Sequence, residues 1–312
     1  MPLLSVVIPV FNAAKFLRDC LDSLLSQSFC DWEALCVDDG SMDGSWGILC
    51  EYASGDSRLR IFNLGANRGV SVARNRALSA ACGEWLAFLD ADDIIDRTWL
   101  ERLVRHATGK VDIVHVDAMC GFSGRVLRRS LRRASDATLF LRDGWSQLNL
   151  VRRSFLASTR YPEGMRFKED VVFFTALALK GARIAVVAES GYNYRHHSGS
   201  AIAAHVTEDD SLRFVYELSR LSLERRDFGR AAGYDLVLWV KGRDWSVAFD
   251  PSQSRLLSFW REAIAGGSLR VNDLRWWWRP GLRRWLAHGD LKLFKYVLDL
   301  RMKAGSMFEV FR

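Results

Sequence analysis

The sequence Trp85-Leu86-Ala87-Phe88-Leu89-Asp90-Ala91-Asp92-Asp93 attaches three carboxylates to the end of an apolar run. A short apolar run rich in aromatic residues is typical of a buried central strand of a parallel sheet. The carboxylates would then lie at the carboxyl edge of that sheet, where open α/β sheets bind their ligands. Three acids within four residues repel one another and require a compensating cation. Because the neighbouring ligands are hard oxygens, the pattern predicts Mg(II) or Mn(II).

A simpler interpretation of the three acids is a polar turn. Asp92 or Asp93 would then cap a helix that the sequence predicts from about Asp96 to Ala107, by accepting a hydrogen bond from a free backbone N–H. The acids alone do not distinguish a helix cap from a metal site, so the rest of the chain has to decide.

Length and composition restrict the class of protein. The 312 residues suffice for one large α/β domain with an appendage, or for two domains. With 49% hydrophobic and 12% aromatic residues, the chain can bury a sizeable core. No apolar window reaches 18 residues, which argues against a membrane-spanning helix. The six cysteines form no CxxC pair, so we expect free thiols in a reducing cytoplasm.

The net charge of +7 predicts an anionic partner, which is nucleic acid, a lipid surface or a phosphorylated substrate. The excess is concentrated in the segment 125–133 and in the C-terminal third. Segment 121–134 has five arginines and no acid, and we expect an exposed loop or hairpin there. It is either a solvated face or a contact with an acceptor or a lipid phosphate. The modest overall charge and the clustering of aromatic residues at one C-terminal place argue against nucleic acid.

The N-terminal part alternates between strand and helix patterns. A β-branched run over Ser5–Val10 precedes an amphipathic helix over about Ala14–Ser26, and the apolar run Trp32–Val37 follows. Strand, helix and strand in this order predict a parallel βαβ unit. Further strands are expected over three more ranges, which are Arg58–Asn63, Val111–Ala118 and Ala182–Ala188.

A second acidic loop, Asp38-Asp39-Gly40-Ser41-Met42-Asp43, follows the second predicted strand. Ser41 or Asp43 is expected to cap the next helix. Capping does not account for Asp38 and Asp39 together. A carboxylate here would accept the imide proton of a uracil ring or bond ribose hydroxyls.

Two later segments carry candidate functional groups. Asn67–Asn75 enters a helix whose first turn would offer N–H groups and Arg74 to a diphosphate, unless Arg74 is an ordinary surface residue. Glu169 and Asp170 begin a helix predicted over Val171–Lys180, where the helix dipole favours an ionised carboxylate. That setting suits a general base, and it equally suits a plain cap.

Towards the C-terminus, the segment Arg195-His196-His197 would bind a diphosphate or complete a metal shell, or it is an ordinary exposed pair of histidines. After Val206 the pattern becomes helical, with an amphipathic stretch over Leu212–Phe228. Segment 275–285 has four tryptophans and four arginines in eleven residues. These suit an interfacial membrane anchor, or tryptophans in a helical core with arginines at its surface.

Taken in order, these segments resemble an inverting glycosyltransferase of family 2 over about residues 1–205. The segments that carry the resemblance are Ser5–Asn12, Val37–Asp43, Asn67–Asn75, Phe88–Asp93, Glu169-Asp170 and Tyr194–Ser200. The resemblance implies an α/β protein with the glycosyltransferase A fold, in which helices flank a central, mainly parallel sheet. The catalytic domain would span residues 1–205, and a mostly helical extension would span 206–312.

The resemblance also implies residue roles. Asp39 would contact the base, and the backbone around Pro9 and Phe11 would line the same pocket. Asp90 would lie near the ribose and Asp92 on the metal, for which His197 is a second candidate ligand by its own chemistry. Asp170 would be the catalytic base, with Glu169 its neighbour, and Arg74 and Arg195 would face the diphosphate.

The implied reaction moves a sugar from a UDP-sugar to a hydroxyl of a saccharide or lipid-linked saccharide acceptor. It uses Mn(II) or Mg(II), inverts the anomeric centre and serves cell-surface polysaccharide or lipopolysaccharide synthesis. The expected location is the cytoplasm, with peripheral contact with the inner membrane face. A nucleotidyltransferase is one alternative, but it would show a basic, glycine-rich loop in place of 11–14. A non-catalytic module that binds nucleotide-sugars or anionic glycans is another.

Overall fold

The computed structural model describes residues 1–116, 118–121, 126–128, 139–143, 145–189, 191–195, 197, 207–221 and 255, with only the backbone of 118–121, 126–128 and 142–143. The chain forms two compact units, Met1–Ser198 and Gly199–Arg312. The functional boundary expected near residue 205 stays a prediction. The tryptophan-rich segment 275–285, the arginines of 129–133 and His196 lie outside the described residues.

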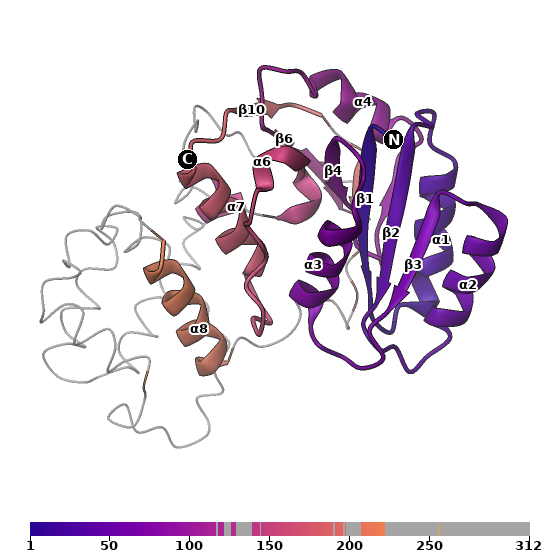
Figure 1. Ribbon diagram of the computed structural model, residues 1–312, viewed down its shortest axis with the longest axis horizontal. Helices are drawn as coiled ribbons and strands as arrows, with labels where there is room; N and C mark the ends of the chain where they lie inside the picture. The colour runs from indigo at the N-terminus through magenta and orange to yellow at the C-terminus, as the bar shows by residue number, and fades with distance from the viewer. Residues whose placement is uncertain are drawn as a thin grey trace, which may run out of the picture. The chain divides into compact units, whose positions relative to one another are not determined.

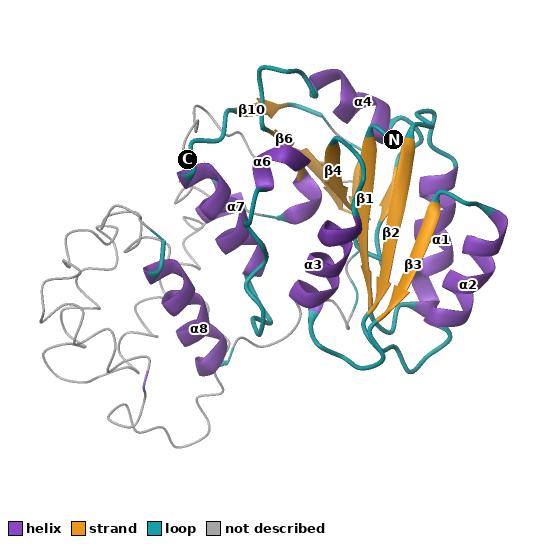
Figure 2. Ribbon diagram, viewed as in Figure 1, coloured by secondary structure: helices purple, strands orange, loops and turns teal. Residues whose placement is uncertain are grey.

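The first unit is built on a seven-stranded sheet in the order β10-β6-β9-β4-β1-β2-β3 (Figure 2). Its strands are β1 Leu4–Val10, β2 Trp32–Asp38, β3 Leu59–Asn63, β4 Trp85–Phe88, β6 Ile113–Val116, β9 Asn149–Arg152 and β10 Ile184–Val187. Strand β9 is antiparallel to both neighbours, and the other pairs are parallel. The mainly parallel sheet is therefore confirmed.

A smaller sheet has the order β5-β11-β7-β8. Its strands are β5 Ile94–Ile95, β11 Tyr192–Tyr194, β7 Ala118–Gly121 and β8 Val126–Arg128. The single strand predicted over Val111–Ala118 is wrong, because this run is divided between β6 and β7 in different sheets. Strands β7 and β8 pair as an antiparallel hairpin at the start of the arginine-rich segment.

Helices cover both faces of the large sheet (Figure 1). They are α1 Ala14–Leu25, α2 Ser45–Gly55, α3 Val70–Ala80, α4 Trp99–His106, α5 Phe140–Asp143, η1 Ser146–Leu148, α6 Arg153–Leu156 and α7 Glu169–Leu179. Alternate residues of a strand face opposite sides. Accordingly, Val6 and Ile8 of β1 pack in the core with α1 and α4, whereas Val7 packs in the core with α3 and α7.

Helix α4 begins later than predicted and lacks the expected cap. It starts at Trp99 after Thr98, with no side-chain cap among the described residues. Neither Asp92 nor Asp93 caps it. The Asp93 carboxylate accepts hydrogen bonds from Tyr192 and from the Arg195 backbone, and the Asp92 carboxylate contacts His197. The polar-turn interpretation of the acidic run is therefore wrong as a capping explanation.

In the second unit, the structure describes one helix, α8 Glu208–Ser219. It begins earlier than the predicted Leu212 because Thr207 and Asp210 form a reciprocal capping box. Within the described part of the chain, no helix combines the length and apolar character needed to cross a membrane.

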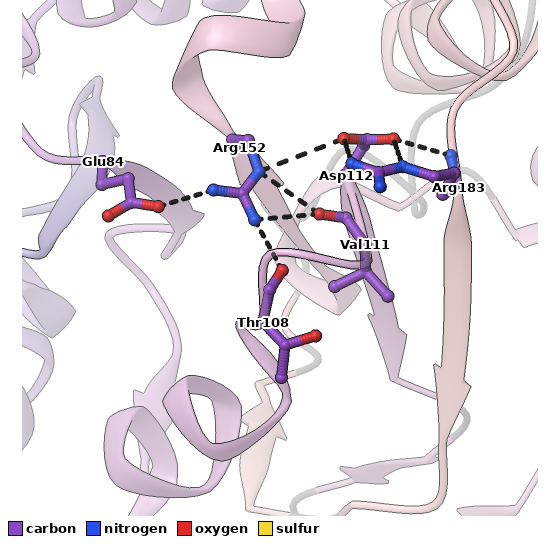
Figure 3. A network of polar contacts seen from close by, with 6 residues as sticks. All are labelled: Glu84, Thr108, Val111, Asp112, Arg152 and Arg183. Carbon is purple, nitrogen blue, oxygen red and sulfur yellow. Dashed lines mark hydrogen bonds and ion pairs between the residues drawn. The ribbon is translucent and has the colours of Figure 1, made fainter.

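Because β9 runs antiparallel to β4 and β6, its C-terminal end lies at the amino edge of the sheet and its N-terminal end at the carboxyl edge. Its last residue, Arg152, lies at the amino edge of β4 and β6, where it bonds Glu84 and approaches Asp112 (Figure 3). Arg183 binds the same Asp112 carboxylate through its backbone and its guanidinium. This ion network fastens β9, β6 and β10 at the amino edge. The other end of β9, together with η1, is thereby left at the carboxyl edge.

Candidate active site

Arg74 lies at the centre of a buried cluster of charges at the carboxyl edge of the sheet. One terminal nitrogen is 2.6 Å from Glu169 Oε1 at the start of α7, and the other is 3.1 Å from Asp90 Oδ1 after β4. The Arg74 side chain is only 6% exposed. Its Nε has no hydrogen-bond partner among the described residues. The predicted diphosphate-side arginine therefore joins two of the predicted acidic residues directly.

The second oxygen of Asp90 accepts a hydrogen bond from Gln147 Nε2 at 3.1 Å. Gln147 belongs to η1, which β9 holds at this edge. Burial raises the pKa of Asp90, the Arg74 guanidinium opposes that rise, and repulsion from Asp92 adds to it. Asp90 is thus held by one cation and one amide, both from segments distant in the sequence.

Helix α7 begins at Glu169, two residues before the predicted Val171, and Glu169 and Asp170 lie in its first turn. Lys168 before them has a left-handed backbone, with φ of 61°. Asp170 Oδ1 accepts a hydrogen bond from the N–H of Val171 at 2.8 Å. Burial and then repulsion from Glu169 raise the pKa of Asp170 to about 7, although Arg74 opposes them. A carboxyl group with this pKa exchanges protons near neutral pH, as a general base must.

Asp92 and His197, the two predicted metal ligands, are in direct contact. His197 Nε2 lies 2.8 Å from Asp92 Oδ2, and the imidazole packs on the Phe16 ring with centroids 4.5 Å apart. The described residues contain no group of three His, Cys, Asp or Glu that would enclose an ion. Magnesium sites that bind nucleotides often use one or two protein carboxylates together with phosphates and water. Asp92 fits such a partial shell, and His197 lies against it.

Arg195 lies beside this pair but is turned towards α1. Its Nη2 is 3.0 Å from Asp19, and its guanidinium lies over the Phe16 ring at 5.0 Å from the centroid. Its backbone N–H donates to Asp93. The structure therefore brings Arg195 close to the acidic turn, with the charged end on α1.

The predicted base-binding residues lie at the ends of β1 and β2. Phe11 follows β1 and is 44% exposed, whereas Pro9 is within the strand, opposite Val37. Asp39 is buried, and its two oxygens accept the N–H groups of Arg68 and Gly69 at 2.7 and 2.8 Å. In this structure Asp39 fastens the loop that enters α3, and its contact with a base stays a prediction.

Neither Ser41 nor Asp43, the residues expected to cap the next helix, is its N-cap, because α2 follows Gly44 and that residue provides no side-chain cap. Asp43 nevertheless bonds the first N–H groups of two helices. Asp43 Oδ1 accepts the N–H of Ser45 at the start of α2, while Oδ2 accepts the N–H of Ala14 at the start of α1. Ser41 does not cap α2. Its hydroxyl instead accepts the N–H of Asn12. The first two loops of the carboxyl edge are thereby joined.

Asn75 is a site residue for which the sequence indicated no role. It donates to the carbonyl of Tyr161 at 3.0 Å and accepts the N–H of Tyr161 at 2.9 Å. This reciprocal pair holds the loop that leads to Glu169. Gln147 and Tyr192 are likewise site residues without a local sequence signal, since neither belongs to a motif and both reach the site only through tertiary contacts.

Comparison with known proteins gives the site its context. The model of "Glycosyl transferase family 2" matches residues 5–187. The "Uncharacterized glycosyltransferase EpsJ" of Bacillus subtilis (strain 168) is 32% identical over 222 residues, which are 64% of this chain and 63% of that protein. The "Uncharacterized glycosyltransferase YibD" of Escherichia coli (strain K12) is 30% identical over 230 residues, which are 68% and 66% of the two chains. The matches thus cover slightly less than two thirds of these relatives.

The fold resembles that of S. aureus TarS, with a TM-score of 0.73, 22% identity, and coverage of 97% of this chain and 92% of that one. TarS has also been solved with UDP-GlcNAc. These likenesses show the glycosyltransferase A fold. The family match spans more than half of the chain and includes eight of the ten predicted site residues, with Arg195 and His197 beyond it. The chain belongs to glycosyl transferase family 2.

Proposed function

We propose that the protein transfers a sugar from a UDP-sugar to a hydroxyl of a saccharide acceptor, with inversion and with the help of a divalent cation. The observation that carries the proposal is the buried contact of Arg74 with both Asp90 and Glu169. This contact joins Asp90, which would lie beside the sugar donor, to Glu169, the neighbour of the proposed catalytic base Asp170. Both lie at the carboxyl edge of the sheet.

In this reaction Asp170 takes the proton of the acceptor hydroxyl. Its pKa of about 7 suits that task, since a general base works best when its pKa is near the operating pH. Glu169 is held by Arg74, which leaves Asp170 as the carboxylate of the pair that is not ion-paired with Arg74. Attack from the side opposite the leaving diphosphate inverts the anomeric carbon, by the same logic as in inverting hydrolases.

Departure of a nucleoside diphosphate leaves negative charge that the site must neutralise. Asp92 and His197 would hold the cation, which supplies Lewis-acid stabilisation of that charge when it is bound. The structure of a mannosyltransferase from Pyrobaculum calidifontis with GDP-Man and Mn2+, at a TM-score of 0.55 and 18% identity, supports a metal as a reasonable component of this fold.

Cell-surface polysaccharide synthesis is the proposed setting. A poly(ribitol-phosphate) beta-glucosyltransferase of Bacillus spizizenii is 30% identical over 201 residues, which are 61% of this chain and 32% of that protein. The complex of TarS with UDP-GlcNAc supports uridine as the base.

The direct test is to incubate the full chain with a panel of UDP-, GDP- and dTDP-sugars, with Mn(II), Mg(II) or a chelator. Release of the nucleoside diphosphate and thermal shift are then measured, since a ligand that binds only the folded state raises the melting temperature. We expect UDP release and a thermal shift with at least one UDP-sugar and a metal. A thermal shift without turnover, in the presence of saccharide acceptors, would instead indicate a binding module.

We also propose that segment 275–285 contacts the inner membrane face. Its tryptophans and arginines are the residues that interfacial segments use. Co-sedimentation of the full chain with anionic vesicles tests this, with replacement of Trp276, Trp277 and Trp278 by alanine as the variant. Equal sedimentation of the two proteins would contradict the proposal.

A further inference from the structure

Tyr192 and Asp93 form a buried pair directly behind the acidic turn. The Tyr192 hydroxyl donates to Asp93 Oδ2 at 2.6 Å and accepts the N–H of Asp90 at 3.2 Å. Both side chains are fully buried. One phenol oxygen therefore connects the backbone at the first acid of the turn with the side chain of the last.

The same carboxylate also fixes the segment that follows β11. Asp93 Oδ1 accepts the N–H of Arg195 at 2.7 Å. Upstream, the N–H of Asp96 donates to the carbonyl of Gly191 at 2.8 Å, and β11 pairs with β5. The chain from 191 to 195 is thereby attached at one end to Asp96 and at the other to Asp93, two residues before His197.

Asp92 and His197 lie 105 residues apart in the sequence, and each lies within two residues of a residue that forms this attachment. Asp92 lies between the two residues that Tyr192 binds. His197 lies two residues beyond the backbone N–H that Asp93 holds. The 2.8 Å contact between Asp92 and His197 thus depends on the relative position of two segments that Tyr192 and Asp93 fix.

We propose that Tyr192 and Asp93 are positioning residues, which hold Asp92 and His197 in register for the cation and the diphosphate. The inference rests on the proposed function. Both side chains are buried, so they act through the residues they hold. Removal of the phenol hydroxyl would leave the Asp90 N–H and one Asp93 oxygen without this partner, inside the protein, where such losses are costly.

The variants Tyr192→Phe, Asp93→Ala and Asp93→Asn, in the full chain, test this. Asparagine retains an acceptor for the Arg195 N–H but presents its NH2 group to the Tyr192 hydroxyl, whose proton then loses its acceptor. Asp93→Asn should therefore rescue only part of what Asp93→Ala loses. Tyr52→Phe is the matched control, since its hydroxyl bonds Asp22 at 2.7 Å and interacts with Arg18, and both of these partners are exposed.

Three quantities are measured, which are hydrogen exchange at the Asp90 and Arg195 amides, the Mn(II) concentration for half-maximal binding of UDP, and the donor KM. We expect Tyr192→Phe to accelerate exchange at both amides and to raise both half-saturation values about tenfold, with Tyr52→Phe unchanged. If Tyr192→Phe kept the exchange rates and half-saturation values of the wild-type chain, the proposal would be overturned. A fall in kcat alone would also overturn it, because that indicates a purely structural role.

The outcome is separable from the proposed function. If the wild-type chain releases UDP from no UDP-sugar, the proposed function fails. The exchange rates and the binding of Mn(II) with UDP still decide the positioning role. If the wild-type chain does not bind Mn(II) with UDP at all, the positioning role towards a cation is overturned as well.

Discussion

Arg74 of α3 and Glu169 of α7 are 95 residues apart in the sequence, and their side chains form a buried ion pair at 2.6 Å. The same guanidinium holds Asp90 after β4, so a single cation of α3 joins acids from two other segments of the chain. Burial of charge is unfavourable unless it is well paired. This arrangement is therefore stable only while all its members are present, and it couples the integrity of the fold to the chemistry of the site.

Arg74→Met is expected to lower the free energy of unfolding by about 3–5 kcal/mol, because it leaves the buried Glu169 and the partly buried Asp90 without their cation. Denaturant midpoints measure this. Arg18→Met is the matched control, since Arg18 forms a two-bond pair with Glu51 at the surface. It is expected to change stability little. Equal effects of the two substitutions would contradict the assignment of Arg74 as the centre of the buried cluster.

Asp170 should make the rate of sugar transfer fall at low pH. Its ionised form accepts the proton, so the rate should rise as the pH increases through about 7. Asp170→Asn should lower kcat by roughly 100-fold to 10,000-fold, the usual range for a general base. A steady-state pH profile checks both. A wild-type rate that is flat between pH 5 and 9 would exclude Asp170 as the base.

The same shift predicts how stability depends on pH. Burial raises the pKa of Asp170 in the folded state to about 7, above the value of about 3.9 for an unperturbed aspartate. The folded protein therefore binds more protons between these values, and its stability falls as the pH rises through them. Relative to wild type, Asp170→Asn should be more stable at pH 8 than at pH 5. Urea unfolding at the two pH values measures the difference, and the opposite sign would refute it.

Removal of divalent cations with a chelator should reduce sugar transfer by about 100-fold, a typical loss when one electrostatic stabiliser of the leaving group is removed. Added Mn(II) should restore the rate. Asp92→Asn should require a higher Mn(II) concentration for half-maximal activity, because one of the two candidate protein ligands is weakened. Asp22→Asn, on the surface of α1, is the control. Full activity in the chelator would contradict a role for the cation.

Two glycines provide a test of the loop after β2. Gly40 has φ of +71°, and a Cβ there would lie 2.5 Å from the Ala66 carbonyl carbon, so Gly40→Ala should cost about 1–3 kcal/mol or more. Gly47 lies within α2 and a Cβ there would meet nothing within 4 Å. Gly47→Ala should therefore stabilise the protein by about 0.5–1 kcal/mol. Thermal unfolding of the two variants measures these opposite shifts, and shifts of the same sign would contradict them.

The sequence determined the elements and the edge at which the site lies. Apolar runs such as Trp85–Phe88 and the amphipathic helix that begins at Ala14 have local periods that fix strand or helix. Acids directly after parallel strands must lie at one edge, so Asp39 and Asp90 were predictable as residues of the same rim. Such features follow from a few consecutive residues and need no knowledge of distant contacts.

Only the tertiary structure decided which groups meet. The antiparallel insertion of β9 brings Gln147 to Asp90, and the buried position of Arg74 makes it a partner of two acids. The Tyr192–Asp93 pair similarly gives Asp93 a role that a cap would not. These contacts join segments that lie tens of residues apart. They depend on how whole elements pack, which the local period of a sequence does not encode.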